Sequence, residues 1–135
     1  MVAYSFRPQF EEPIITLIKL QTVRANRKRH ARPGEPVQLY TGMRTRSCRK
    51  LLTPDPICRD VRHIEIGLDS LSPQLIDAIE IEGVALNGDE IEAFAIADGF
   101  GSAAKGFARR RMGEFWCQSY DWRRFIGVVI RREPR

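Results

Sequence analysis

The stretch Lys19-Leu20-Gln21-Thr22-Val23-Arg24 carries the densest polar chemistry in the chain, and its spacing predicts a change of backbone conformation. Lys19 and Thr22 are three residues apart and would share a face on a helix, whereas Thr22 and Arg24 are two apart and would share a face on a strand. An apolar run precedes the stretch and a β-branched pair lies inside it. We therefore expect a short helix that passes into a strand near Gln21, so that the three polar side chains converge.

The pair Lys19 and Thr22 has the chemistry of an activated nucleophile. A hydroxyl is a weak nucleophile unless a base lies beside it, and amines serve as that base in known hydrolases. Lys19 would have to be neutral for part of the time, which burial and the nearby charge of Arg24 both favour. The alternative is structural, because threonine is common in strands and lysine and arginine usually lie on solvated faces. Spacing alone leaves both interpretations open.

Length and composition indicate one globular domain over residues 1–135. The 135 residues are 43% hydrophobic and 29% charged, values typical of a chain that buries a core of its own. No segment is long or apolar enough for a membrane span or a signal peptide. We therefore expect a cytoplasmic protein with no membrane partner.

The three cysteines, Cys48, Cys58 and Cys117, have wide and irregular spacings. This pattern fits neither a disulfide framework nor a paired C-x-x-C metal site. Cys48, Cys58 and His63 could in principle meet at a metal, but reduced structural thiols are the stronger expectation. We expect no metal and no cofactor.

The formal net charge of +5 is unevenly distributed along the chain. Between Glu65 and Asp98 there are nine acidic residues and no lysine or arginine. Basic residues gather earlier, at Arg24, Arg27, Lys28, Arg29, Arg32, Arg44, Arg46, Arg49 and Lys50. This polarity favours an anionic partner, nucleic acid first, held by one surface. The alternative is a solvated loop rich in arginine.

Periodicity and turn signals predict the remaining elements. Strands are expected at 2–7, 22–24, 36–41, 61–66, 78–82 and 125–130, the fifth of which also has features of a helix, and a basic loop at 25–34. Helices are expected from Glu11 to about Lys19, from the turn at Asn87 to Asp98-Gly99, and after a cap at Ser102. In the last helix Ala104, Phe107, Ala108, Met112, Phe115 and Trp116 would face the core, with Arg109 and Arg110 outside. Without βαβ alternation or a glycine-rich phosphate loop, this order indicates a small barrel decorated with helices and not a Rossmann fold.

Four landmarks together resemble the ASCH domain family of the PUA-like superfamily. They are the helix leading into residues 19–24, the turn Arg32-Pro33-Gly34-Glu35, the strand Gln38-Leu39-Tyr40-Thr41-Gly42-Met43-Arg44-Thr45, and Ala97-Asp98-Gly99-Phe100. The resemblance covers nearly the whole chain. It departs at Leu17, where the family usually has glycine two residues before the lysine; extra bulk there could narrow the site or move Lys19.

The resemblance implies an α+β fold, a small PUA-like β-barrel of about five to six strands with two to three flanking helices. Its cleft would face RNA or a modified nucleoside. Some small bacterial ASCH proteins are amidohydrolases that remove the acetyl group from N4-acetylcytidine, and their lysine and threonine match Lys19 and Thr22. Their catalytic glutamate falls at Asp98, which is one methylene shorter. Arg24 matches the arginine after the threonine and would stabilise an oxyanion or bind phosphate.

The implied function is an ASCH domain that binds RNA or a nucleoside, with a deacylating hydrolase site at Lys19, Thr22 and Asp98. A non-catalytic RNA-binding module, a ribonuclease such as another ASCH protein, and a protein-interaction domain that uses the acidic half remain as alternatives. The oligomeric state is left open. The residues expected to contact RNA phosphate or substrate are Arg24, Arg27, Arg29, Arg32, Arg44 and Arg46.

Overall fold

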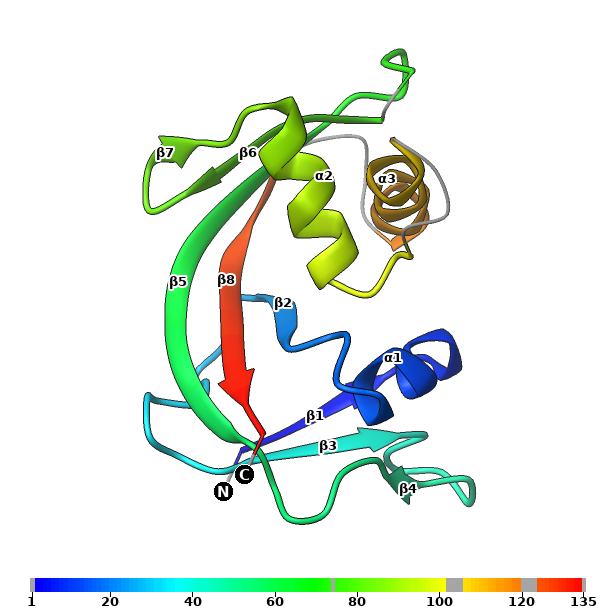
Figure 1. Ribbon diagram of the computed structural model, residues 1–135, viewed down its shortest axis with the longest axis vertical. Coiled ribbons are helices and arrows are strands. Elements are labelled where there is room, and N and C mark those ends of the chain that lie inside the picture. Colours follow the sequence, from blue (N-terminus) through cyan, green and yellow to red (C-terminus); the bar gives the residue numbers. More distant parts are fainter. Residues whose placement is uncertain (1, 74, 102–105, 120–123, 135) are drawn as a thin grey trace. The chain divides into compact units, whose positions relative to one another are not determined.

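A computed structural model describes residues 2–73, 75–101, 106–119 and 124–134. Within these ranges the chain is an α+β protein whose strands form two sheets, ordered β1-β3-β4 and β2-β8-β5-β6-β7 (Figure 1). The strands are β1 (Val2–Phe6), β2 (Gln21–Ala25), β3 (Val37–Thr41), β4 (Arg49–Lys50), β5 (Ile57–Leu68), β6 (Ile76–Ile81), β7 (Val84–Ala85) and β8 (Arg124–Glu133). The helices are the 3-10 helix η1 (Pro8–Phe10) and the α-helices α1 (Glu11–Ile15), α2 (Gly88–Ala97) and α3 (Phe107–Ser119). The mixed class is confirmed, whereas the described strands make two sheets and not one closed barrel.

The chain divides into two compact units. The first comprises Met1–Thr22, Arg27–Val61 and Ile130–Arg135, and the second comprises Val23–Asn26 and Arg62–Val129. Strands β2, β5 and β8 contribute residues to both units. The expected single domain over residues 1–135 stays a prediction.

In the first unit, β1 and β3 pair in parallel, from Val2 opposite Val37 to Phe6 opposite Thr41. The alternation expected for the first strand is confirmed, because Val2, Tyr4 and Phe6 are buried. Side chains two apart on a strand share a face, so these three line one side of β1. That side is where the candidate site is built.

In the second unit, β5 and β6 form an antiparallel pair. Each of the two helices that follow has a side chain that binds backbone N–H groups at its start, an amide for α2 and a carboxylate for α3. Asn87 caps α2 in a reciprocal capping box with Glu90. The Glu92 carboxylate accepts hydrogen bonds from the backbone N–H groups of Gly106 at 2.8 Å and Arg109 at 2.7 Å, at the start of α3. The expected cap Ser102 lies outside the described residues, as does Ala104.

Three residues of the predicted apolar stripe of α3 are confirmed as core, whereas Phe107 and Phe115 are half-buried. Ala108, Met112 and Trp116 are buried, and the Trp116 ring packs on Phe125 with centroids 4.6 Å apart. The expected outward position of Arg109 is wrong, because this side chain is half-buried and its Nη2 donates to the Ile76 carbonyl at 2.8 Å. No helix within the described ranges is long and apolar enough to cross a membrane.

Several predicted boundaries differ from those in the structure. The first helix ends at Ile15 and not near Lys19. Strand β5 starts at Ile57, directly after Pro56, which is earlier than predicted. Its pairing with β6 continues to Leu68, so the strand also ends later than predicted. Strand β8 continues to Glu133, so residues expected to be a polar tail are part of a sheet. The two-residue strands β4 and β7 gave no periodic signal.

Leu17 explains the early end of α1. Its φ of 63° is left-handed, a conformation that costs a residue with a Cβ roughly 1–2 kcal/mol and normally selects glycine after a helix. This is the position at which the ASCH pattern has glycine. The Leu17 side chain is 42% exposed. Leucine at this position therefore strains the backbone and adds no bulk to the core.

Replacing Leu17 with glycine should therefore stabilise the protein. We expect a gain of about 0.5–1 kcal/mol, the relief of the left-handed strain less the extra freedom of glycine in the unfolded chain. Urea denaturation monitored by circular dichroism measures it. Leu17→Ala is the matched control, because it removes the exposed side chain and keeps the Cβ; equal stability of the two variants would contradict the strain.

Candidate functional site

The end of α1 fixes the backbone of Lys19. The Pro13 carbonyl accepts hydrogen bonds from the N–H groups of both Ile18 and Lys19, each at 2.9 Å. Together with the left-handed Leu17, these bonds turn the chain sharply before β2 begins at Gln21. Lys19 therefore belongs to a helix-capping turn, and the predicted change from helix to strand before Thr22 is confirmed with a shorter helix.

The Lys19 side chain is buried, with an exposed fraction of 3%. Its Nζ lies 4.8 Å from the centroid of the Phe10 ring and 5.8 Å from that of Phe6. Lysine is among the residues least often fully buried, and aromatic faces are among the few apolar surfaces that attract its charged form. The solvated-face interpretation of Lys19 is therefore wrong.

Thr22 is also buried, on β2, and a residue absent from the sequence-based site contacts it. Arg132 of β8 is 3% exposed, and its Nη1 lies 3.5 Å from the Thr22 Oγ1. The Nη2 of the same guanidinium donates to the Lys19 carbonyl at 2.8 Å. The Phe6 ring lies 5.8 Å from the Arg132 Cζ. The first unit thus gathers Lys19, Thr22 and Arg132 beside Phe6.

Sequence reasoning missed Arg132 because it lies in the charged run Arg131-Arg132-Glu133. Ile130 and Arg132 are two residues apart and share a buried face, but this face lies opposite the one that buries residues 125, 127 and 129. The alternation of the preceding strand residues therefore did not predict the burial of Arg132.

Asp98 is 3% exposed and lies in the second unit, directly after α2. It is the C-cap residue of that helix, and its N–H donates to the Phe94 carbonyl at 2.9 Å, before Gly99 with a φ of 96°. A carboxylate at a helix C-terminus is repelled by the helix dipole, and burial adds a desolvation cost. Helix capping therefore does not account for an acid here. The meeting of Asp98 with Lys19 and Thr22 stays a prediction.

The predicted phosphate-contacting arginines occupy three different places. Arg27, Arg29 and Arg32 are exposed in the loop before β3, and Arg44 and Arg46 are exposed in the turn after it. Strand β3 is five residues long, so it separates the loop before it from the turn after it by roughly 16 Å. Arg24 is half-exposed on β2 and belongs to the second unit.

The basic loop, residues 26–34, is attached to β1 through Tyr4. The Tyr4 hydroxyl lies 2.9 Å from His30 Nδ1 and accepts a hydrogen bond from the Ala31 N–H at 3.2 Å. The Arg27 guanidinium lies over the Tyr4 ring, 4.5 Å from its centroid. Since Tyr4 and Phe6 share a face of β1, this loop covers the same face as Lys19 and Arg132.

Glu35 closes the loop. Its carboxylate accepts hydrogen bonds from the Arg32 N–H at 2.7 Å and from the Arg29 guanidinium at 2.6 Å. The Arg32 N–H, followed by the Arg29 side chain, lowers the pKa of Glu35. Part of the positive charge of the loop is therefore neutralised locally.

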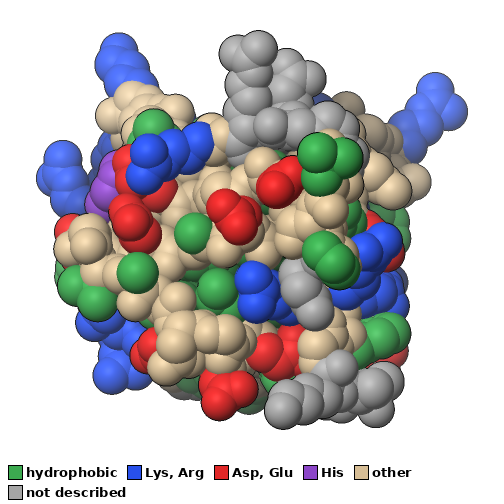
Figure 2. Space-filling model, turned by 90° about the horizontal axis from the view of Figure 1, so that it is seen from above, with side chains coloured by type: hydrophobic (Ala, Val, Ile, Leu, Met, Phe, Trp, Pro, Cys, Tyr) green, Lys and Arg blue, Asp and Glu red, His purple; other side chains and the backbone are tan. Residues whose placement is uncertain are grey.

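The acidic stretch also has structural roles within the second unit. The Arg124 guanidinium binds Glu65 at 2.6 Å and lies 3.7 Å from Glu80. Figure 2 shows one face on which acidic side chains lie among basic and hydrophobic ones. A hollow of about 350 Å³ beside this cluster contains no predicted site residue; it is lined by Glu65, Gly67, Leu68, Asp77, Ala78, Glu80 and Arg124.

Comparison with known proteins adds no identity. The chain matches no protein-family model, no curated protein and no solved structure. The resemblance to the ASCH family therefore rests on the landmarks in the sequence.

Metal ligands are not clustered in the part of the chain that the structure describes: no three His, Cys, Asp or Glu side chains there could hold an ion. Cys48 is exposed, Cys58 is buried and Cys117 is half-buried, and all three are free thiols. Burial, followed by the charges of Asp60 and Glu35, raises the pKa of Cys58. Burial also raises the pKa of Cys117.

Alkylation should therefore distinguish the three thiols. The thiolate is the reactive form, so iodoacetamide at pH 8 should modify Cys48 at least about tenfold faster than Cys58 or Cys117. Peptide mass spectrometry after timed quenching measures each rate. In Cys48→Ser the fast phase should disappear; rapid labelling of Cys58 in that variant would show that it is accessible.

Proposed function

We propose that this chain is an ASCH-type domain that binds a modified nucleoside or RNA and deacylates substrates such as N4-acetylcytidine. The observation that carries the proposal is the burial of Lys19 and Thr22 in one unit, both tied to the Arg132 guanidinium. The PUA-like barrel, the single domain and the cytoplasmic location are parts of the same proposal.

Burial suits Lys19 to the role of base. Removal from water and the nearby Arg132 guanidinium disfavour the charged ammonium, whereas the Phe6 and Phe10 rings favour it. The role of base requires the first two effects to be the larger. A neutral amine accepts the proton of a threonine hydroxyl, whereas a solvated ammonium does not.

In the proposed reaction, the Thr22 Oγ1 attacks the acetyl carbon and its proton passes to the Lys19 Nζ. The tetrahedral oxyanion collapses, the carbon–nitrogen bond breaks, and the proton moves from Lys19 to the leaving N4 of cytidine. Water then attacks the acetyl-threonine with Lys19 again as base, which releases acetate and restores both residues. Asp98 would orient Lys19 or exchange protons with it.

The direct test is incubation of the protein with N4-acetylcytidine, followed by chromatography of cytidine. Lys19→Arg keeps a positive charge but cannot give up a proton, because guanidinium stays ionised at any workable pH. We expect turnover to fall by a factor of about 100 or more, which is typical for loss of a general base.

Two controls accompany this variant. Lys50→Arg makes the same exchange at a lysine that pairs with Asp55 outside the site, and should leave turnover unchanged. Circular dichroism of Lys19→Arg and Lys19→Met shows whether the larger side chain disturbs the fold. A folded Lys19→Arg protein that deacetylates as fast as its parent would remove Lys19 as the base.

A second candidate function, RNA binding without catalysis, is favoured by the exposed cations of the basic loop, Arg27, Lys28, Arg29 and Arg32. A loop held against β1 by Tyr4 presents these cations at low entropic cost. Phosphate contacts made by this loop would give affinity that falls with salt.

Replacing both Arg27 and Arg29 with alanine tests that function. The log–log salt slope for a single-stranded RNA should become shallower by about one to two, since each phosphate contact contributes roughly 0.7. Fluorescence anisotropy over a range of salt concentrations measures the slope. Arg110→Ala with Arg111→Ala removes the same charge from the exposed side of α3 and is the matched control; equal slopes in the two double variants would exclude the basic loop from the interface.

A further inference from the structure

Arg132 is the buried charge that the resemblance to the ASCH family does not account for. It lies on β8, and three of its polar contacts go to the segment 19–22. We propose that Arg132 positions the Thr22 hydroxyl and stabilises the negative charge that forms when this hydroxyl reacts. The resemblance to the ASCH family implied this charge-stabilising role, or phosphate binding, for Arg24. The inference rests on the proposed function and deepens it.

Three contacts hold Arg132 and the segment together. The Arg132 N–H donates to the Leu20 carbonyl at 2.9 Å, and its Nη2 donates to the Lys19 carbonyl at 2.8 Å. Its Nη1 then points at the Thr22 Oγ1, 3.5 Å away. A guanidinium is a rigid planar fork, so fixing one nitrogen on Lys19 fixes the direction of the other. The geometry of the hydroxyl is thereby coupled to that of the lysine backbone.

The contact with Thr22 is long, as hydrogen bonds in substrate-free active sites often are. A donor that occupies a lone pair of Oγ1 directs the hydroxyl proton away from the guanidinium and toward a base. As the C–O bond forms, negative charge develops on the former carbonyl oxygen. A buried cation stabilises such charge more strongly than an exposed one, because little water screens the interaction.

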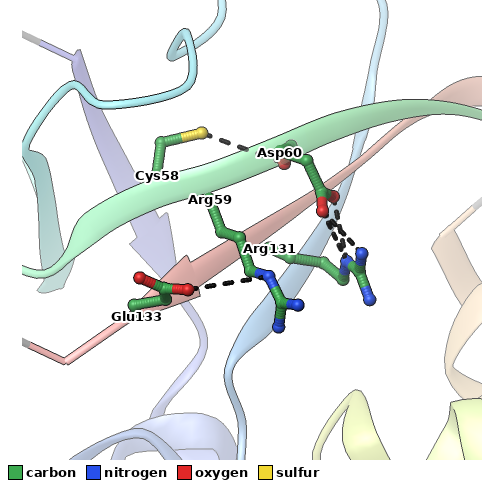
Figure 3. Close-up of polar contacts among 5 residues, drawn as sticks. All are labelled: Cys58, Arg59, Asp60, Arg131 and Glu133. Carbon is green, nitrogen blue, oxygen red and sulfur yellow. Dashed lines mark hydrogen bonds and ion pairs between the residues drawn. The ribbon is translucent and has the colours of Figure 1, made fainter.

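The other candidate arginines are less suitable. Arg24 is half-exposed. Arg131, the neighbour of Arg132, is directed to Asp60, whose carboxylate its Nε meets at 2.9 Å (Figure 3). The same view shows Arg59 paired with Glu133 at 3.6 Å. These pairs lie between β5 and β8, and they show that Arg131 has a structural partner.

This arrangement supplies a matched pair of substitutions, Arg132→Lys and Arg131→Lys. Lysine keeps the charge but presents one compact ammonium, which cannot bind the Lys19 carbonyl and face Thr22 as a fork does. We expect Arg132→Lys to lower kcat for N4-acetylcytidine at least about tenfold and Arg132→Met about 100-fold or more, with KM nearly unchanged. Arg131→Lys should keep the parental kcat.

Thermal melts and circular dichroism on each variant separate this effect from misfolding, and Arg132→Lys is the variant that decides if Arg132→Met does not fold. A folded Arg132→Lys protein with parental kcat would overturn the role of Arg132 and leave the proposed function intact. An equal loss in Arg131→Lys would also overturn it, since the effect would then belong to β8 as a whole.

A second probe decides the inference if the parent protein does not hydrolyse N4-acetylcytidine. In the reaction of Thr22 with p-nitrophenyl acetate, Oγ1 bonds to the acetyl carbon, its proton passes to the Lys19 Nζ, and the ester C–O bond breaks to release p-nitrophenolate. Peptide mass spectrometry then locates the acetyl group. Acetylation of Thr22 that slows at least about tenfold in Arg132→Lys would support the role of Arg132 while the nucleoside substrate fails. No acetylation of Thr22, or an equal rate in Arg132→Lys and its parent, would overturn it.

Discussion

The carbonyl group of Pro13 is the constraint on which the candidate site depends. By accepting hydrogen bonds from Ile18 and Lys19, it ends α1 and turns the chain so that β2 starts almost at once. A helix that continued to Lys19 would occupy the residues that form this turn and leave no room for it before β2 starts at Gln21. This turn requires Leu17 to adopt a left-handed conformation, which strains the backbone; a glycine would avoid that strain.

Buried charge, more than surface charge, distinguishes this molecule. The exposed ions that first suggested an anionic partner are partly neutralised by neighbours, as in Arg29 with Glu35 and Lys50 with Asp55. Lys19, Asp98 and Arg132 are each only 3% exposed. Burying an ionisable group carries a desolvation cost, which proteins often bear at functional sites. The charge pattern of the sequence therefore described the surface, while the buried Lys19, Thr22 and Arg132 of the first unit define the candidate site.

The sequence predicted several features that depend on neighbouring residues and missed others that depend on distant ones. Alternation identified β1 and β3, and the cap at Asn87 identified α2, because these patterns depend on neighbouring residues. The end of α1 was predicted too late, since Leu17 takes a conformation that its own side chain disfavours. Arg132 was missed because its burial depends on strand pairing with a segment more than a hundred positions away, whereas its neighbours in sequence are charged. Lys19 and Thr22 were singled out by their spacing and chemistry and then by a resemblance, and their burial follows from the structure.

Strand β8 completes the candidate site by supplying Arg132. Arg132 reaches Lys19, Leu20 and Thr22 only after the last strand of the chain has paired beside β2, so the site is incomplete until both ends of the chain are in place. Its polar groups are then fixed by backbone hydrogen bonds and by the Phe6 and Phe10 rings. A site held this way needs little rearrangement when charge develops during a reaction, which is the condition under which a buried guanidinium is most effective. The basic loop can vary in sequence without changing this arrangement, because its attachment to β1 passes through Tyr4 and not through the Thr22 segment.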